Sequence, residues 1–221
     1  MKLEQKWYLG KKEAKDEVVE NYFIATVPGA VQLDYGREKN LPDFNYGENV
    51  CAYDQLEQYY WQYQTVISIP DTNQEVYFVS KGIDYEFSII LNHETIFYQE
   101  GMFTPVEINL TNRIKNGDLF EILIYPAPKR EGARKNDREE ADQSCKPAVS
   151  YGWDWHPRLI PLGIWDDTYF ELRDQHSIKS TELFYTLSND YQRVDIHFET
   201  VSDLEVTYSI LDMEGNEIIK T

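Results

Sequence analysis

From residue 59 onward, short apolar runs alternate with turn residues, a pattern typical of strands joined by tight turns. The stretch YYWQYQTVISIP, residues 59–70, alternates polar and apolar side chains and ends at a proline. Within residues 85–99, Asn92-His93 predicts a hairpin turn, because asparagine tolerates the left-handed backbone conformation. The pattern as a whole predicts strands in residues 59–70, 75–81, 85–99, 104–110 and 119–126.

Residues 129–146, KREGARKNDREEADQSCK, interrupt this series with many charges and no apolar face. Such a composition argues against a helix or a strand and predicts a long surface loop. A loop of this length in a compact domain is either a solvated excursion or a functional segment. The sequence leaves both alternatives open.

After residue 173 the pattern changes to three strand-like runs in residues 177–188, 192–200 and 204–212, followed by a hairpin turn within residues 213–220. This is typical of the opening strands of an immunoglobulin-like sandwich, a fold that usually needs about seven strands and about 100 residues. We therefore expect a first domain in residues 1–173 and a shortened second sandwich in residues 174–221. On this expectation the chain is a fragment of a longer protein.

The composition strengthens the all-β prediction, because 17 tyrosines, 10 phenylalanines and 5 tryptophans favour pleated surfaces over helices. A chain of 221 residues is also long enough to bury a core. Its formal net charge of −18 would repel a phosphate backbone, which argues against a nucleic-acid partner. No apolar run reaches the roughly 20 residues that span a bilayer, so we expect no membrane partner.

Cysteine and histidine provide little support for a disulfide or a metal site. The two cysteines are far apart and form no CxxC pair, which favours free thiols. The histidines lack ligand spacing, and we expect neither a metal nor a cofactor. The amino terminus carries no apolar stretch like a signal peptide, which favours the cytoplasm unless a leader was removed. The two cysteines are Cys51 and Cys145, and the four histidines are His93, His156, His176 and His197.

The stretch SYGWDWHPRLIPLGIW, residues 150–165, holds three of the five tryptophans and offers the best candidate site. In a strand, Trp153 and Trp155 would point to one face and Asp154 to the other, so both rings could fill the core. The alternative is a surface on which flat rings and a carboxylate hold a sugar.

Five motifs in order resemble the amino-terminal sugar-binding jelly roll of glycoside hydrolase family 2, and most closely its β-mannosidase branch. The resemblance covers residues 22–173. The most specific of the set is the stretch from GWDWHPR to GIW, residues 152–165. The motifs are ATVPGAVQLDY (25–35), YYWQYQTVISIP (59–70), KGIDYEFSIILN (81–92), EGMFTPVEINLT (100–111) and SYGWDWHPRLIPLGIWDD (150–167).

This resemblance implies a retaining exo-glycosidase in which a jelly roll and an immunoglobulin-like sandwich precede a TIM barrel. Two glutamates on the barrel would do the chemistry, about 5 Å apart in a retaining enzyme. We therefore expect no catalytic residue in this chain. The pair Asn216-Glu217 looks like the family's acid/base motif, but it stands in MEGNEI, a plain hairpin turn.

By the same resemblance, Trp153, Asp154 and Trp155 are substrate-binding residues that help to form the pocket for a terminal β-linked sugar. The implied partners are this carbohydrate and the downstream barrel. We expect Trp165 to be structural and Arg158 to pair with an acid near the motif. The alternative function is a non-catalytic carbohydrate-binding module or an interaction sandwich, since jelly rolls host many activities.

Two positions differ from the β-mannosidase pattern. His156 stands where that pattern usually has glycine, and His93 replaces a turn glycine. The first change adds bulk and a titratable ring beside the expected pocket, so the sequence leaves the sugar open.

Overall fold

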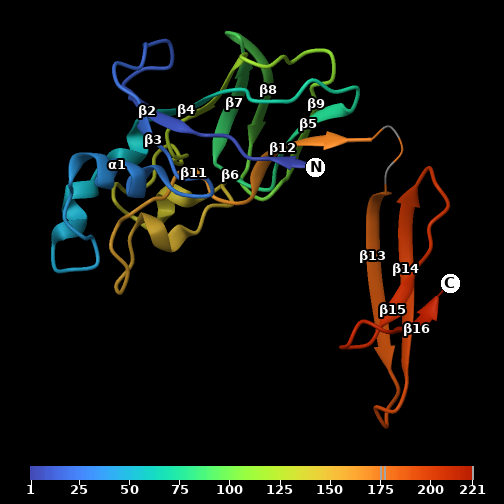
Figure 1. The fold of residues 1–221 in the computed structure, drawn as a ribbon. Coiled ribbons are helices and arrows are strands. Elements are labelled where there is room, and N and C mark those ends of the chain that lie inside the picture. The colour runs from blue at the N-terminus through green and yellow to red at the C-terminus, as the bar shows by residue number, and fades with distance from the viewer. Residues whose placement is uncertain (175, 177, 221) are drawn as a thin grey trace. The chain divides into compact units, whose positions relative to one another are not determined.

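The computed structural model describes residues 1–174, 176 and 178–220, and these divide into two compact units, Met1–Leu172 and Arg173–Thr221. Strands dominate both units (Figure 1). The all-β prediction is confirmed. The first unit is a β-sandwich built on a six-stranded and a four-stranded sheet.

The first unit carries its strands in the two main sheets and one small pair. The six-stranded sheet has the order β3 (Phe23–Ile24), β2 (Tyr8–Lys12), β4 (Tyr60–Val66), β10 (Leu119–Ile124), β7 (Glu86–Leu91) and β8 (Glu94–Glu100). The four-stranded sheet has the order β1 (Lys2–Leu3), β12 (Thr168–Arg173), β5 (Glu75–Ser80) and β9 (Val106–Asn109). The small pair is β6 (Ile83–Asp84) with β11 (Gly163–Ile164).

Three phenylalanine rings join the two main sheets at the centre of the core. Phe78 on β5 and Phe170 on β12 face Phe120 on β10, with ring centroids 4.8 Å (Phe78–Phe120) and 5.0 Å (Phe120–Phe170) apart. All three side chains are fully buried. Phe170 alternates with partly exposed neighbours on β12, and β4 alternates along most of its length, so the period-two pattern holds for these two strands. On β5 and β10 the neighbours Val79 and Glu121 are buried as well.

The predicted hairpin turn is confirmed between β7 and β8. Asn92 and His93 have φ values of 47° and 70°, the double left-handed conformation of a two-residue hairpin turn. His93 therefore occupies a position that glycine usually takes.

One helix was not predicted, α1 (Val31–Lys39), and its burial explains why. Its buried face includes Gln32 and Asp34 as well as Val31, so there is no apolar stripe for the sequence to reveal. Asp34 accepts a hydrogen bond from the Thr26 amide at 2.9 Å, and Gln32 reaches across to residues 160 and 162. Polar contacts thus hold the helix, together with the apolar contacts of Val31 and Tyr35.

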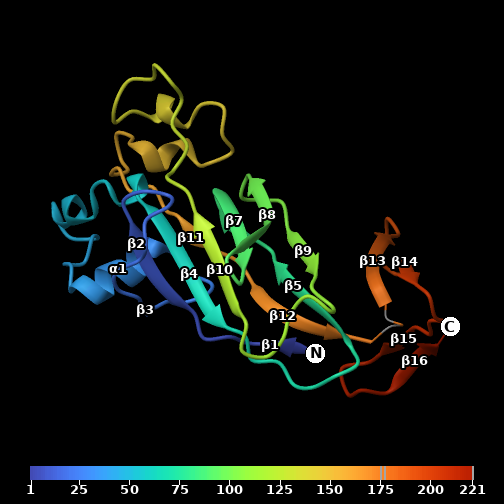
Figure 2. The same ribbon diagram turned by 90° about the horizontal axis from the view of Figure 1, so that it is seen from above.

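The charged segment 129–146 is more structured than expected. The prediction that it holds no helix was wrong, because Arg138–Ala141 form the 3₁₀ helix η3. Asp137 caps this helix by accepting a hydrogen bond from the Glu139 amide at 3.0 Å. Some of its charged side chains are buried and paired, which a count of charges cannot show. The segment leaves β10 at one end of the sandwich (Figure 2).

The second unit consists of two hairpins. They are β13 (Ile178–Leu187) with β14 (Val194–Ser202), and β15 (Ser209–Leu211) with β16 (Glu217–Lys220). Asn216 hydrogen-bonds to Asp212 in the turn between β15 and β16, as expected for a hairpin turn. That this unit begins an immunoglobulin-like sandwich stays a prediction.

Cys51 and Cys145 are exposed free thiols, as expected. Among the described residues, no helix is both long and apolar enough to cross a membrane.

We predict that Phe120→Ala lowers the free energy of unfolding by about 3–5 kcal/mol, because it opens a cavity between the two sheets. Urea denaturation followed by circular dichroism measures this change. Val18→Ala is the control, since Val18 is 83% exposed and should change the value by less than about 0.5 kcal/mol. Equal shifts for the two variants would contradict this account of the core.

Candidate functional site

Residues 146–161 form a hairpin-like projection, which we call the aromatic arm. Its two sides are joined by the Leu159 amide, which donates to the Ser150 carbonyl at 3.0 Å. Further out, Trp153 and His156 exchange backbone hydrogen bonds of 3.0 and 3.2 Å. The two residues between them are therefore the tip of the arm.

The tip exposes the predicted site residues rather than burying them. Trp155 is 74% exposed, and Trp153 is half-buried. Their ring centroids lie 5.1 Å apart, with the ring planes tilted by 60°. The Arg138 guanidinium lies over the Trp153 ring at 3.7 Å from its centroid, a cation–π contact.

The alternative in which both rings fill the core is wrong. It assumed a strand, whereas residues 153–156 form a turn in which strand alternation does not apply. Asp154 is exposed, and its carboxylate has no hydrogen-bond or ion-pair partner within residues 1–174, 176 and 178–220. It is therefore available to accept hydrogen bonds from a ligand.

An open hollow of about 370 Å³ lies between the tip of the arm and η3. Three carboxylates, one indole and two guanidinium groups border it, which is a polar rather than an apolar surface. Its lining residues are Arg134, Asp137, Arg138, Glu139, Gly152, Trp153 and Asp154.

Arg158 holds the outer part of the arm through buried charges, as the sequence led us to expect. Its Nη2 lies 2.9 Å from Glu57 Oε1 and 2.8 Å from Glu140 Oε2. Its Nη1 donates to the Tyr151 carbonyl at 3.0 Å, across the arm. Burial alone would raise the pKa of Glu57, but a backbone hydrogen bond and the charges of Lys129 and Arg158 outweigh it and lower that pKa.

The inner end of the arm is held by a second buried pair, which the sequence did not reveal. Lys146 Nζ lies 2.6 Å from both carboxylate oxygens of Asp84, and neither side chain is more than 3% exposed. Burial raises the pKa of Asp84 and lowers that of Lys146, against their mutual attraction. Nothing in the charged run marked Lys146 as different from its neighbours.

Trp165 packs as a structural residue. Its Nε1 donates to the Met102 carbonyl at 3.1 Å, and its ring lies edge-on to Phe103. A Cβ atom at Gly82 would lie 2.3 Å from the indole, so only glycine fits beneath this ring.

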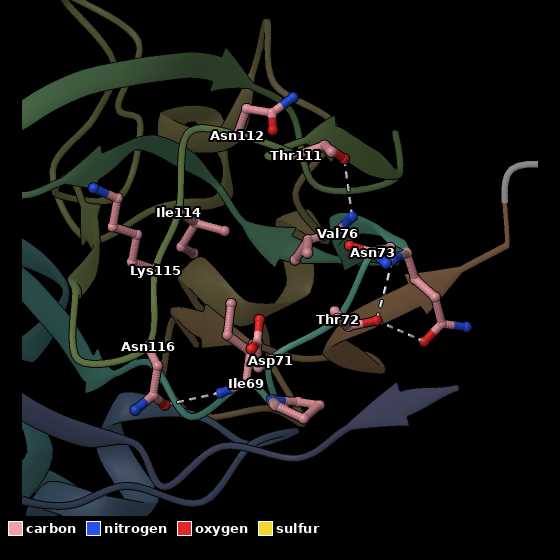
Figure 3. Close-up of a pocket in the computed structure, with 12 residues that line it drawn as sticks. Ile69, Asp71, Thr72, Asn73, Val76, Thr111, Asn112, Ile114, Lys115 and Asn116 are labelled. Carbon is pink, nitrogen blue, oxygen red and sulfur yellow. Dashed lines mark hydrogen bonds between the residues drawn. The ribbon is translucent and has the colours of Figure 1, made fainter.

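A larger hollow of about 580 Å³ lies beyond the other end of β4, between the loops that follow β4 and β9. Figure 3 shows that its polar side chains hold these loops, since Thr111 accepts from the Val76 amide and Asn116 from the Ile69 amide. Among the described residues, those lining it include no aromatic ring to stack on a sugar. It therefore offers a weaker carbohydrate site than the arm.

No metal centre is indicated. Within the part of the chain that the structure describes, no group of three or more His, Cys, Asp or Glu side chains could hold a metal ion. His156 binds the Pro157 carbonyl through Nδ1 at 2.7 Å, next to the tip of the arm.

We predict that Arg158→Met lowers the free energy of unfolding of the first unit by about 3 kcal/mol, because Glu140 would lose its buried cation and Glu57 would keep only Lys129. Chemical denaturation measures this value. The control is Arg113→Met, a change of an exposed arginine, which should leave the value unchanged. A stability equal to that of the original chain would mean that the buried network does not hold the arm.

Comparisons with known proteins agree with this fold. The family model described as "Glycosyl hydrolase 2 galactose-binding domain-like" matches residues 7–166. The chain is 22% identical over 184 residues to a β-mannosidase B of Thermothelomyces thermophilus, covering 77% of this chain and 21% of that protein. It is 24% identical over 203 residues to a β-mannosidase of Rattus norvegicus, covering 83% of this chain and 23% of that protein.

Solved structures of glycosidases share this fold. A β-D-mannosidase from Dictyoglomus thermophilum superposes with a TM-score of 0.74 at 20% identity, covering 100% of this chain and 28% of that one. A β-glucuronidase of an uncultured Clostridium species has a TM-score of 0.64 at 13% identity, covering 100% of this chain and 37% of that one. The chain thus spans 21% and 23% of the length of the two curated relatives named above.

Proposed function

The chain belongs to the glycosyl hydrolase 2 galactose-binding domain-like family, and we propose that it is the amino-terminal portion of a retaining exo-glycoside hydrolase. Its role there is to complete the subsite for a terminal β-linked sugar. In that hydrolase, the catalytic glutamates belong to a TIM barrel that follows these 221 residues. The substrate class follows the β-mannosidases that the chain resembles.

The observation that carries this proposal is the tip of the aromatic arm. Large indole rings are usually at least partly covered in a folded domain, yet Trp155 is 74% exposed beside an unpaired carboxylate.

The chemistry of the tip suits a pyranose. The flat face of an indole packs against the C–H groups of a sugar ring, while a carboxylate accepts strong hydrogen bonds from two adjacent hydroxyls. Asp154 would in this way orient the sugar without transferring a proton. Trp153 would support the sugar or Trp155, since Arg138 holds its ring in place.

The length of the relatives supports a pocket shared with another domain. The chain covers only a small part of each relative named above, and the hollow beside the arm is open. An open hollow of this kind gives a sugar few contacts until a second surface closes it. We assign that surface to the downstream barrel.

The identity of the sugar depends on His156. Its ring adds volume and hydrogen-bonding nitrogens beside the tip, where the β-mannosidase pattern usually has glycine. We therefore propose a β-mannosidase-like exo-glycosidase. Its activity on a β-mannoside should be compared with its activity on a β-galactoside and a β-glucuronide.

We predict that the isolated 221-residue chain does not hydrolyse nitrophenyl glycosides, because the catalytic carboxylates lie outside it. Release of nitrophenol is the measurement, with β-mannoside, β-galactoside and β-glucuronide substrates. Turnover above a protein-free control would overturn the proposal that a downstream domain does the chemistry.

In the full-length enzyme, Asp154→Asn should lower kcat/KM by about tenfold or more, because an amide cannot provide two charge-assisted acceptors. Steady-state kinetics on the preferred glycoside measure this change. The control is Asp71→Asn, an exposed carboxylate that lines the hollow beyond the far end of β4. If both variants stay within about twofold of the original enzyme, Asp154 has no role in sugar binding.

A non-catalytic carbohydrate-binding module is the second candidate, and the exposure of Trp155 favours it as well as the first. The two differ in what the isolated chain does. A module binds an oligosaccharide with the arm alone, whereas half of a shared pocket binds it weakly or not at all. Isothermal titration of the chain with a mannooligosaccharide therefore separates the two candidates.

A further inference from the structure

We infer that Lys146 is a positioning residue, whose ammonium group closes the base of the aromatic arm and sets the geometry of the tryptophan pair at its tip. The geometry of the arm stands on its own. That this geometry serves sugar binding rests on the function proposed above.

The position of Lys146 in the arm is the first argument. It begins the arm, and its Nζ donates to the Pro161 carbonyl at 2.7 Å, at the end of the arm. This contact is the innermost of a nested series, followed by the Ser150–Leu159 and Trp153–His156 backbone hydrogen bonds. The sequence numbers of the paired residues converge toward the tip, as in a hairpin. Lys146 thus supplies the inner rung with its side chain, where no backbone hydrogen bond joins the two sides.

The partner of Lys146 ties this rung to the sandwich. Asp84 lies on β6, and its Cα partner on β11 is Gly163, two residues beyond Pro161. The outgoing side of the arm is therefore attached to β6 through the ion pair, and the returning side through strand pairing. Both sides meet at one residue, Asp84, the outgoing side at its carboxylate and the returning side at its strand, which fixes their separation.

Burial makes this arrangement specific. The Lys146 side chain is 0% exposed and that of Asp84 is 3% exposed. A buried ammonium needs all of its three donors satisfied, and here two carboxylate oxygens and one carbonyl oxygen satisfy them. An apolar side chain could fill this space, but it could not hold the Pro161 carbonyl. Lys146 thus makes two contacts that variants can separate, the ion pair with Asp84 and the hydrogen bond to the Pro161 carbonyl.

Two single variants separate these roles. Asp84→Asn breaks the ion pair but leaves the Lys146 nitrogen bonded to Pro161. Lys146→Met breaks both contacts. The double variant Asp84→Leu with Lys146→Met leaves no unpaired buried charge, and such replacements of a buried pair are often neutral or stabilising. Lys81→Met, which removes an exposed partner of Asp167, is the control.

The readout is the exciton couplet of Trp153 and Trp155 in the far-ultraviolet circular dichroism spectrum. Rings whose centroids lie 5.1 Å apart with planes tilted by 60° couple strongly, and the couplet changes when either the distance or the tilt changes. The difference spectrum between the original chain and Trp155→Phe identifies it. All measurements use the 221-residue chain, well below the unfolding midpoint of each variant.

We expect both single variants to lower the unfolding midpoint of the first unit by about 10 °C. Only Lys146→Met should lose the couplet. The double variant should regain the midpoint of the original chain without regaining the couplet. Lys81→Met should keep both.

Two results would overturn the inference. The first is an unchanged couplet in Lys146→Met. The second is a couplet that returns with stability in the double variant, which would mean that Lys146 serves only the stability of the sandwich. If the double variant does not fold, the comparison of the two single variants decides, because equal loss of the couplet in both contradicts the inference. None of these results depends on sugar binding, so a failure of the proposed function would not be mistaken for a failure of this one.

Discussion

The burial of the Lys146 ammonium against Asp84 is the constraint on which the geometry of the candidate site depends. Transfer of both charges out of water costs several kcal/mol for each ion, and only close contacts offset this cost. Those contacts require Asp84 on β6, the start of the arm and the Pro161 carbonyl to meet at one point. The core aligns the sheets, but this buried pair determines where the arm leaves them.

The same principle recurs along the arm. Arg158 joins it to Glu57 and Glu140, and Gln32 on α1 donates to the Ile160 carbonyl and accepts from the Leu162 amide. In each case a polar group from a distant part of the chain satisfies a polar group of the arm. The arm therefore consists of irregular backbone whose inner polar groups are paired, and its large exposed apolar side chain, Trp155, is at the tip.

The fold could be predicted from the sequence where burial follows strand alternation. Trp61 and Tyr63 lie on β4, where the period of two is visible in the letters, and Asn92 marked its turn by its own backbone preference. The helix α1 could not be predicted in this way, because its buried face is partly polar.

The candidate site could be predicted in composition but not in shape. The resemblance to a family singled out Trp153, Asp154 and Trp155, and the structure places all three in one turn. Spacing alone suggested a strand with both rings in the core. The contacts that decide the matter join residues far apart in sequence, such as Lys146 and Asp84, and no local pattern contains that information.

On the function proposed above, this domain presents one wall of a pocket for a sugar. The arm that carries the rings and the carboxylate is anchored by buried charges before any ligand arrives, so less ordering is needed when a sugar binds. The chemistry itself would come from the second wall. On that proposal, sugar recognition lies on the β-sandwich and bond cleavage on a domain outside these 221 residues.

The most direct test of this account is a structure of the full-length enzyme with an analogue of its terminal sugar bound. The account predicts that the Asp154 carboxylate lies within about 2.5–3.0 Å of a sugar hydroxyl, with an indole of the arm against the sugar or beside it. A sugar bound in the barrel with the arm turned away, and no part of residues 153–155 near it, would contradict the account.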